Sequence, residues 1–587
     1  MELRKSIENA LSVALKNLGI ESLSFKLDIP QDLAHGDYTS NIALVASQKL
    51  HQNPMEVGQK IKDKITLSYP VERIEVVKPG FINFWLSKDY VITQLQEVLE
   101  QRERFGMTTR SQFNGIKIMV EFTDPNPFKE FHIGHLYSNT VGESLSRLLE
   151  SQGAMVWRVT YQGDVGLHVA KALYGILQGS KFKVQSSRLD EESLEKRAKI
   201  LGEAYAMGSK AYEEDDRAKK EIIEINKKVY EGSDPQILEL YQKGRQWSLE
   251  YFEAIYKRLG SKFIKNYFES AAGPIGLNLV KDHIKDGVFK ESEGAIIFEG
   301  EKYGLHSRVF INSLGLPTYE AKDMALPQIK YKDFPYDESI IITAVEQSDY
   351  FEVILKALSL INPDLASKTR HIAHGVVRLL EGKMSSRTGN VITGEWLLDE
   401  AKKKIQQSFK DVDQDTAEKI AVGAVKYALL KSGIGKDIAF SFEESVSLEG
   451  NSGPYLQYTY ARTQSVLTKF KTQSSKLKST VQSSKVDQKL EPEEILLLRL
   501  VHRFPEVVQE ATEQFAPHAL CNYLFDLAQA FNLFYQKHKI LGTEAQKGSE
   551  GQRLIGLQEF RVVLTEATGQ VLKNGLHLLG IAAPERM

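Results

Sequence analysis

The sequence has one cysteine, no long apolar run and almost no net charge, and these absences limit the kinds of protein that it can be. Because Cys521 is the only cysteine among 587 residues, the chain can form neither an intramolecular disulfide nor a zinc site built from cysteines. It contains no run of eighteen apolar residues that could cross a membrane. The N-terminus mixes charged with apolar residues and has no signal-peptide core, so we expect a cytoplasmic protein.

The charge balance bears on possible partners. The formal net charge is −2, whereas a protein that binds nucleic acid usually carries a basic surface. Composition alone therefore speaks mildly against an RNA-binding role, and any RNA contact must use local patches. The chain is also too long for a single hydrophobic core, so roughly two to four domains are expected.

The first part of the chain, residues 1–108, predicts a small α+β domain. Apolar residues at helical spacing predict a helix over residues 1–18, and two short strands joined by a turn at Pro79-Gly80 are expected within residues 74–86. A charged helix over residues 90–105 then leads into the next domain.

The middle part, residues 109–400, has the pattern of an α/β core. β-rich runs at 116–122 and 156–161 enclose a helical pattern over 135–152, and this order predicts a βαβ unit with parallel strands. Many charged residues, with apolar residues at every third or fourth position, predict a helical insertion around 180–270. Further strand-like runs follow at residues 295–298, 308–311 and 339–345.

The last part, residues 401–587, is almost wholly helical in pattern and predicts an all-α bundle. A polar segment, 471–489, interrupts this pattern and is expected to be a loop. Cys521 lies in an apolar helical run, so we expect a buried small side chain rather than a nucleophile.

The motif His132-Ile133-Gly134-His135 lies between a predicted strand and a predicted helix. Ligands of open α/β sheets bind beyond the carboxyl ends of the strands, and a helix N-terminus there offers free N–H groups to a phosphate. Gly134 lets a nucleotide approach the backbone closely, and the two histidines can donate to phosphoryl oxygens. Two incidental histidines in a loop are the alternative for so short a match. A metal site is not expected, because no third ligand lies nearby in the sequence.

Residues 383–387, with the sequence KMSSR, form a second motif, and glycines lie on both sides of it. Its lysine and arginine can hold pyrophosphate as it leaves, and closure of such a loop on ATP would exclude water. A solvent-exposed basic turn is the alternative interpretation.

Together the two motifs, in this order and about 250 residues apart, resemble the HIGH and KMSKS signatures of class I aminoacyl-tRNA synthetases. Longer stretches narrow the resemblance to the arginyl-tRNA synthetase family. These stretches are residues 34–44, 79–84, 121–126, 161–166, 316–323, 346–349, 447–458 and 572–587. The resemblance touches nearly the whole chain, and only the charged insertion lacks an obvious match.

The resemblance implies a fold and a reaction. The fold is an α/β Rossmann-like class I synthetase catalytic core with a small α+β N-terminal domain and an all-α C-terminal anticodon-binding bundle. The reaction joins L-arginine to tRNA(Arg) through arginyl-adenylate, with ATP as a substrate that carries Mg²⁺. Neither zinc, DNA nor a membrane is an expected partner, and family resemblance favours a monomer.

The arginine pocket that the resemblance implies can also be argued physically. A guanidinium presents a planar fork of donors that suits a carboxylate, and Asp323 is the first candidate for that partner. Tyr319, four residues earlier, would lie on the same helix face and offer its hydroxyl or its ring. The resemblance assigns the substrate's ammonium to Glu121 and Asn126, and the remaining polar wall to Gln347.

The resemblance also implies residues for the other substrates. ATP binding is assigned to Pro125, His132, Gly134, His135, Lys383 and Met384. Catalytic roles are assigned to His132, Gly134, His135, Lys383, Ser385 and Ser386. Contacts to tRNA are assigned to His35, Tyr38, Asn83, Tyr455, Tyr458 and Arg462. Aromatic rings can stack on unpaired bases, although packing inside the bundle is an equally good interpretation for any one of the bundle's tyrosines.

The chain departs from the family pattern at several positions. Phe128 and Lys129 stand where small residues usually precede the HIGH motif, Tyr137 stands where a basic residue is common, and Ser386 replaces the second lysine of KMSKS. We hypothesise that Lys129, close to His132 in the sequence, supplies the missing positive charge and so has a catalytic role.

Two alternatives stay open at this point. A synthetase for another amino acid would share both signatures but would lack the 449–458 stretch and the N-terminal extension. A catalytically silent RNA-binding relative is favoured by the altered second signature. The intact HIGH motif, Lys383 and the full set of pocket residues oppose that alternative.

Overall fold

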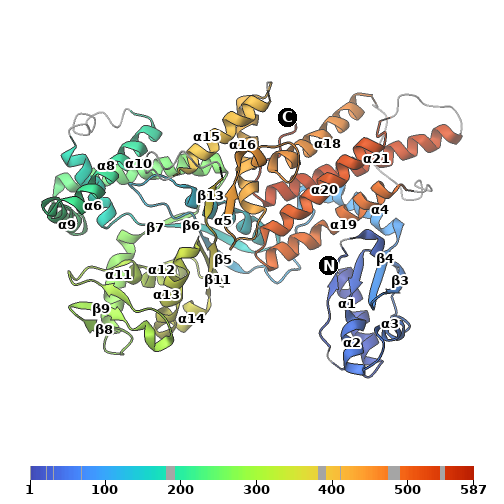
Figure 1. The fold of residues 1–587 in the computed structure, drawn as a ribbon, viewed down its shortest axis with the longest axis horizontal. Helices are drawn as coiled ribbons and strands as arrows, with labels where there is room; N and C mark the ends of the chain where they lie inside the picture. Colours follow the sequence, from blue (N-terminus) through green and yellow to red (C-terminus); the bar gives the residue numbers. More distant parts are fainter. Residues whose placement is uncertain are drawn as a thin grey trace.

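The computed structural model describes most of the chain. The described residues are 2–21, 23–30, 32–67, 69–179, 192–380, 392–409, 411–473, 490–541 and 549–587. Along the chain they build an N-terminal α+β unit, a parallel sheet with a long helical insertion, and a helical C-terminal part (Figure 1).

The N-terminal unit packs helices against an antiparallel sheet of order β1-β2-β4-β3. Its last two strands form the predicted hairpin, and Gly80 in the turn has a φ of +142°, which favours glycine. The elements are α1 (Glu2–Lys16), β1 (Leu27–Asp28), η1 (Leu33–His35), β2 (Tyr38–Ser40), α2 (Ile42–Leu50), α3 (Pro54–Lys62), β3 (Val71–Val77), β4 (Phe81–Leu86), α4 (Lys88–Gln101) and η2 (Arg102–Arg104).

The central sheet has five parallel strands in the order β12-β11-β5-β6-β7. The chain forms β5 in the middle of the sheet and then adds β6 and β7 on one side of it. It later adds β11 and β12 on the other side of β5, so the direction of winding reverses between β5 and β11. Ligands of such sheets bind at this switch point, beyond the carboxyl ends of the strands. The strands are β5 (Lys117–Glu121), β6 (Met155–Gln162), β7 (Lys265–Phe268), β11 (Glu338–Ala344) and β12 (Thr369–His374).

The predicted βαβ unit is confirmed as β5, α5 (Ile133–Ser151) and β6. Two other predicted strands exist but lie outside the parallel sheet, because β8, β9 and β10 form a separate antiparallel sheet. Glu293 and Gly294, with φ of +50° and +79°, make the two-residue turn that folds β8 back on β9. The elements are β8 (Lys290–Ser292), β9 (Ala295–Phe298) and β10 (Arg308–Ile311).

The charged insertion is helical, as its spacing predicts. The side chains of Ser193, Asp215 and Asp234 accept hydrogen bonds from backbone N–H groups at the helix starts, while Gly232 and Gly260 end two of the helices with positive φ. The helices pack with α6 around a hydrophobic cluster of their own. They are α6 (Leu167–Gln178), α8 (Leu194–Glu214), α9 (Asp216–Glu231) and α10 (Pro235–Leu259).

Between β7 and the helical part, short helices surround the sheet. They are α11 (Glu269–Asp282), η4 (Gly300–Tyr303), α12 (Tyr319–Asp333), η5 (Val345–Gln347), α13 (Ser348–Ile361) and α14 (Pro363–Ser367). The strand β13 (Val377–Leu379) then pairs in parallel with β14 (Ile438–Phe440), a strand that the sequence analysis did not predict in the helical part.

The helical part packs against α5, the first helix after β5, and the two share one large hydrophobic cluster. Cys521 is buried there, as predicted. The helices are α15 (Gly394–Ser408), α16 (Gln414–Leu430), α17 (Phe442–Ser445), α18 (Gly453–Gln473), α19 (Pro492–Glu513), α20 (Pro517–Lys537) and α21 (Ser549–Leu578).

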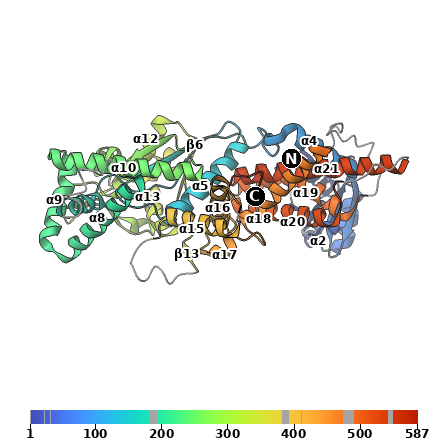
Figure 2. The ribbon, with the colours of Figure 1, turned by 90° about the horizontal axis from the view of Figure 1, so that it is seen from above.

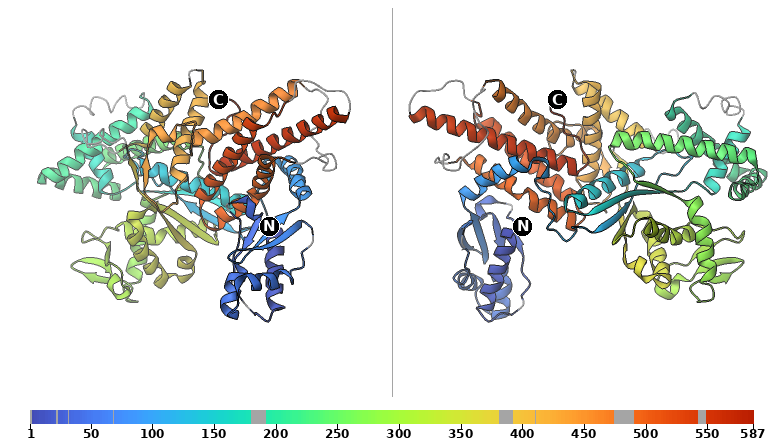
Figure 3. Two further views of the ribbon diagram at one scale, coloured as in Figure 1. Left: turned by 45° about the vertical axis from the view of Figure 1, so that its right-hand side comes forward. Right: turned by 180° about the vertical axis from the view of Figure 1, so that it is seen from behind.

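The molecule is elongated, with the insertion at one end and the N-terminal unit with α18–α21 at the other (Figure 1, Figure 2). The N-terminal unit and the α11–α14 region project to the same side (Figure 1). The helix α10 runs as one rod from the insertion toward α15 and α16 (Figure 2; green in Figure 3, right). In the part of the chain that the structure describes, no helix combines the length and apolarity needed to cross a membrane.

Candidate active site

A cavity of about 550 Å³ opens at the switch point of the parallel sheet. Glu121 at the end of β5, Ala344 at the end of β11 and His374 at the end of β12 all line it. The loop after β5, the start of α5 and one face of α12 complete its walls. Eight residues that the sequence analysis assigned to arginine or ATP line this one cavity: Glu121, Asn126, His132, Gly134, His135, Tyr319, Asp323 and Gln347.

The two histidines of the HIGH motif cap helix α5. Nδ1 of His132 accepts a hydrogen bond from the Gly134 N–H at 3.1 Å, and Nδ1 of His135 accepts one from the His132 N–H at 3.2 Å. The two rings stack with centroids 3.5 Å apart. Because each Nδ1 accepts, each neutral ring carries its proton on Nε2 and can donate it to a ligand.

Both histidines are uncharged near neutral pH. Burial, with repulsion from Lys129, lowers the pKa of His132 to about 4. Burial and the neighbouring His132 lower the pKa of His135 well below its ordinary value. The rings therefore act as hydrogen-bond donors rather than cations, and a triphosphate needs its positive charge from other groups. Lys129 is near enough to His132 to lower its pKa, and its Nζ lies 5.0 Å from the ring centroid of Tyr205 in the insertion.

The loop after β5, residues 122–131, is strained at three points. Thr123, Asp124 and Phe128 have φ of +81°, +45° and +67°, which non-glycine residues rarely adopt. Such strain persists only where the surroundings fix the backbone, and it concentrates at functional sites. One support is visible at Asp124, whose Oδ1 accepts a hydrogen bond from the Tyr161 N–H at 2.7 Å.

The same loop holds Asn126 against the segment after β6. Its Oδ1 accepts a hydrogen bond from the Gly163 N–H at 3.0 Å. A Cβ at Gly163 would lie 2.5 Å from this oxygen, so only glycine leaves room for the contact. A carbonyl oxygen has two lone pairs, so Asn126 can still accept from a substrate's ammonium. Pro125 is buried beside it.

Two buried carboxylates of the cavity are already paired with lysines. Glu121, 3% exposed, forms an ion pair with Lys330, which is 1% exposed. Glu269 accepts a hydrogen bond from the Nζ of Lys322 at 2.6 Å. The sequence analysis missed both lysines and Glu269. Because each lysine neutralises its partner, neither carboxylate is left as an unpaired buried charge.

Asp323 differs from these two carboxylates. Its Oδ2 accepts a hydrogen bond from the neutral hydroxyl of Tyr350 at 2.6 Å, and within the described residues it forms no ion pair. Burial, with the carboxylates of Glu269 and Glu121 nearby, raises the pKa of Asp323 to about 8. A half-buried carboxyl group in a cavity wall, without a cation of its own, is what a guanidinium ligand requires.

Tyr319 and Gln347 lie at the rim of the cavity. Tyr319 is the first residue of α12, so the predicted helical relation to Asp323 is correct, and it is 54% exposed. Gln347 is exposed at the end of η5. Because both side chains are exposed at the rim, they can contact a ligand in the cavity without any change in the hydrophobic core.

The second signature lies outside the described residues, and with it Lys383, Met384, Ser385 and Ser386. The segment that follows it is described. The N–H of Ile133 donates to the carbonyl of Ile392 at 3.0 Å, and His132 forms a β-bridge with Thr393. The chain that leaves the second signature is thus hydrogen-bonded directly to the HIGH motif.

Three residues of the N-terminal unit were expected to contact tRNA, and the structure corrects one of them. Tyr38 is 2% exposed and its hydroxyl donates to Glu506 of α19 at 2.6 Å, so it packs the N-terminal unit on the helical part. Asn83 is 1% exposed and accepts from Thr39, but its Nδ2 has no hydrogen-bond partner in the described part of the chain. His35 is exposed.

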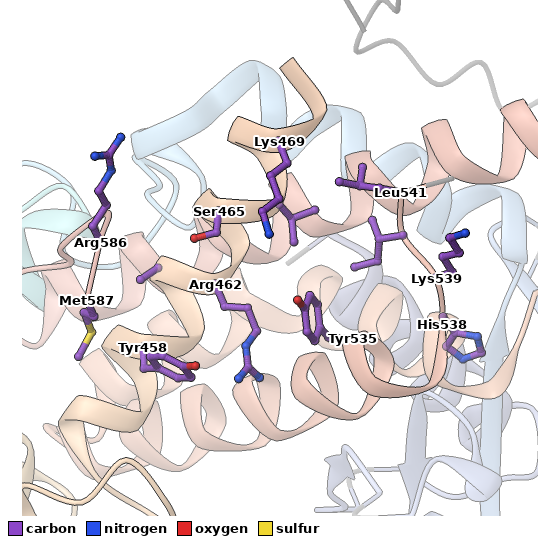
Figure 4. A pocket seen from close by; sticks show the side chains of 13 residues that line it. Tyr458, Arg462, Ser465, Lys469, Tyr535, His538, Lys539, Leu541, Arg586 and Met587 are labelled. Atoms are coloured by element: carbon purple, nitrogen blue, oxygen red, sulfur yellow. The ribbon is translucent and has the colours of Figure 1, made fainter. Parts of the chain in front are cut away.

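A second cavity, of about 670 Å³, lies in the helical part. Cζ of Arg462 lies 4.8 Å from the ring centroid of Tyr458 and 5.0 Å from that of Tyr535. Figure 4 shows Arg462 between Tyr458, which lies on the same helix, and Tyr535 of α20. Further cationic residues line the same cavity: Lys469, Lys539 and Arg586.

Tyr455 does not line this second cavity. Its hydroxyl accepts a hydrogen bond from Nδ2 of Asn532 at 3.0 Å, and its ring contacts Phe525 with centroids 5.7 Å apart. Tyr455 is half-buried and packs between α18 and α20, and its expected tRNA contact stays a prediction.

Three family models match the chain in sequence. Residues 1–86 match the model described as arginyl tRNA synthetase N terminal domain, and residues 456–587 match the DALR anticodon binding domain. Residues 94–442, more than half of the chain, match the model described as tRNA synthetases class I (R), catalytic domain. The chain belongs to the arginyl-tRNA synthetase family.

Individual arginyl-tRNA synthetases resemble the chain along nearly its whole length. The arginine–tRNA ligase of Flavobacterium psychrophilum is 31% identical over 564 residues, which cover 91% of this chain and 90% of that protein. The Treponema denticola enzyme is 33% identical over 518 residues, covering 86% and 85%. The Thermus thermophilus arginyl-tRNA synthetase structure superposes with a TM-score of 0.78 at 25% identity over 100% of both chains.

Membership of the arginyl-tRNA synthetase family decides between the readings that the sequence left open. The chain is an enzyme that ligates arginine to tRNA through an aminoacyl-adenylate, and ATP is a substrate of that reaction. Neither a synthetase for another amino acid nor a silent relative fits these matches.

Proposed function

We propose that the cavity at the switch point binds arginine with its guanidinium on Asp323 and its ammonium near Asn126 and Glu121. The observation that supports this orientation is the pairing of the buried carboxylates. Glu121 already has the cation of Lys330 as a partner, whereas Asp323 accepts a hydrogen bond from the neutral hydroxyl of Tyr350 and forms no ion pair among the described residues. Tyr319 and Gln347 line the rim with exposed side chains, and they would cover the substrate there.

In this arrangement the carboxylate of arginine attacks the α-phosphate of ATP, which enters as its magnesium complex. Arginyl-adenylate forms and pyrophosphate leaves; a terminal hydroxyl of tRNA then attacks the activated carbonyl and releases AMP. His132 and His135 donate Nε2–H hydrogen bonds to the phosphates, and Gly134 leaves the backbone accessible beside buried Pro125. Lys383, Met384, Ser385 and Ser386 are proposed to close on ATP and to hold the pyrophosphate.

Lys129 is proposed to supply the charge that the neutral histidines lack. Replacing Lys129 with alanine should lower arginine-dependent pyrophosphate exchange by about 10-fold, which corresponds to a loss of about 1.4 kcal/mol of charge stabilisation in the transition state. The measurement compares K129A with K383A, which should abolish exchange. Unchanged exchange in K129A, beside abolished exchange in K383A, would remove Lys129 from the mechanism.

The affinity for arginine should depend on pH through Asp323. Burial and nearby carboxylates raise the pKa of Asp323 to about 8 in the empty cavity, so below that pH the group must lose a proton to bind a guanidinium. Arginine binding should therefore release a proton and tighten as pH rises from 6.5 toward 8, by up to about 10-fold per pH unit. Calorimetric titration in buffers of different ionisation enthalpy counts the protons. Equal affinity across this range, with no proton release, would exclude this role.

The helical part is proposed to bind tRNA at its second cavity. Arg462 between Tyr458 and Tyr535 offers flat surfaces and a positive charge, which suit unpaired bases and their phosphates. In the N-terminal unit, exposed His35 stays a candidate for a further tRNA contact, as does Asn83, whose Nδ2 has no hydrogen-bond partner among the described residues.

The remaining features of the enzyme are proposals of the same kind. We place the domain boundaries at 1–108, 109–400 and 401–587, with tRNA(Arg) as the RNA substrate. The enzyme is proposed to act in the cytoplasm as a monomer, without DNA or a membrane as partner.

A further inference from the structure

Phe128 belongs to the hydrophobic core of the helical insertion, although it lies in the loop that precedes the HIGH motif. Its side chain is 0% exposed and packs in the cluster formed by α6 and α8–α10. Phe122 and Phe131, from the same loop, belong instead to the cluster that α5 shares with the helical part. Phe128 is thus the point at which this loop enters the insertion.

The insertion offers Phe128 a slot on one face of α10. A Cβ at Gly244 would lie 2.3 Å from Cε1 of Phe128, so the ring fits only because residue 244 is glycine. The ring of Tyr241 stacks on the Phe128 ring with centroids 6.4 Å apart and an angle of 13° between the planes. The Oγ of Ser248 accepts a hydrogen bond from the Phe128 N–H at 3.0 Å. Residues 241, 244 and 248 are spaced by three and four, which places them on one helix face.

Helix α10, which carries the slot, is held near both of its ends. Near the slot, the buried carboxylate of Asp164 accepts hydrogen bonds from the Tyr241 hydroxyl at 3.2 Å and from Nε of Arg245 at 2.8 Å. At the far end, Nζ of Lys426 in α16 donates to the carbonyl of Leu259 at 2.6 Å. The rod that Figure 3 shows is therefore anchored to the segment that follows β6 and to the helical part.

Asn126, two residues before Phe128, lines the cavity, and Lys129, directly after it, lowers the pKa of His132 in the cavity wall. The N–H of Lys129 donates to the carbonyl of Asn126 at 3.2 Å, so Phe128 lies inside a tight turn. Its φ of +67° is unfavourable for a bulky residue and needs support from its surroundings. Any shift of the ring therefore moves Asn126 and Lys129 together.

We propose that Phe128 is a positioning residue: seated in the α10 slot, it sets the placement of Asn126 and Lys129 and thereby the rate of adenylate formation. The helical insertion thus takes part in the chemical step without touching the substrates. This inference rests on the proposed roles of Asn126 and Lys129 in the cavity.

The test changes the slot and leaves the loop's sequence intact. In Gly244→Ala the new methyl group displaces the ring, and kcat for arginine-dependent pyrophosphate exchange should fall by about 10-fold or more, because small misplacements of reacting groups are costly. Phe128→Leu lacks the Cε1 atom that the methyl group meets. The double variant G244A/F128L should therefore recover most of the kcat lost in G244A. A purely structural role predicts additive losses of stability and an unchanged kcat in the folded fraction.

Gln242→Ala is the matched control, because Gln242 is exposed on α10 beside the slot and its loss should leave kcat unchanged. Should G244A fail to fold, Ser248→Ala serves instead: it removes the acceptor of the Phe128 N–H without adding bulk, and kcat should fall by about 3-fold. Wild-type kcat in folded G244A, a double variant worse than G244A, or an unchanged kcat in S248A would each overturn the proposal. If the wild type itself showed no arginine-dependent pyrophosphate exchange, the proposed function would be contradicted instead.

Discussion

Replacing Asp323 with asparagine should raise the KM for arginine in pyrophosphate exchange by about 100-fold or more and leave the KM for ATP almost unchanged. Asparagine preserves the size of the side chain and its contact with the Tyr350 hydroxyl, but it removes the charge. Loss of one partner of a buried, hydrogen-bonded charge pair costs about 2–5 kcal/mol, and 100-fold corresponds to about 2.7 kcal/mol. The measurement is exchange at saturating ATP, with arginine varied and tRNA present.

Tyr350→Phe is the matched control for this prediction. It keeps the ring and removes the hydrogen bond that Asp323 accepts, and that bond lowers the pKa of Asp323. Its loss should shift the pH dependence of arginine binding upward and weaken binding near neutral pH by a few-fold only. An unchanged KM for arginine in D323N would show that the guanidinium lies elsewhere, whatever the behaviour of Y350F.

Replacing Lys330 with methionine should destabilise the catalytic domain severely. Both members of the Glu121–Lys330 pair are almost fully buried, so the variant leaves a carboxylate without a partner in the interior. Breaking such a pair typically costs about 3–5 kcal/mol, a large share of a domain's stability. Urea unfolding without substrates, followed by tryptophan fluorescence, should show the first transition at clearly lower denaturant concentration.

The double variant E121Q/K330M provides the control, because it removes both charges and leaves none unpaired. It should be more stable than K330M alone, since the two substitutions are strongly coupled. Arginine should also stabilise K330M more than it stabilises the wild type, because the proposed contact of the substrate's ammonium with Glu121 replaces the lost lysine. Wild-type stability in K330M, or a double variant no better than the single one, would contradict this account of the pair.

The sequence predicts those parts of the fold that local patterns determine. The predicted β5–α5–β6 unit, the N-terminal hairpin and the helical insertion are all present, because apolar spacing and capping residues act within a few positions. The antiparallel sheet β8–β10 shows the limit of such patterns. The sequence predicts β9 and β10 but neither β8 nor the pairing of all three strands in a sheet of their own, because strand pairing depends on contacts between segments and not on local spacing.

The candidate site was predicted where a motif marks it and missed where only tertiary contacts define it. Lys330 pairs with Glu121, and Glu269 pairs with Lys322. In each pair the two residues come from different elements of the chain. Lys330 lies on α12 seven residues after Asp323, which places the two on one helix face and was the available signal. The burial of Tyr38 against α19 could not be read from its aromatic and loop-like neighbourhood, because Glu506 is 468 residues away.

The central claim is that the cavity around Asp323 selects arginine for transfer to tRNA. The most direct measurement incubates the purified protein with ATP, magnesium, bulk tRNA and each labelled amino acid in turn, and counts label in acid-precipitable RNA. The account predicts label with arginine alone. Label with a different amino acid, or no label from folded protein that still binds tRNA, would contradict it.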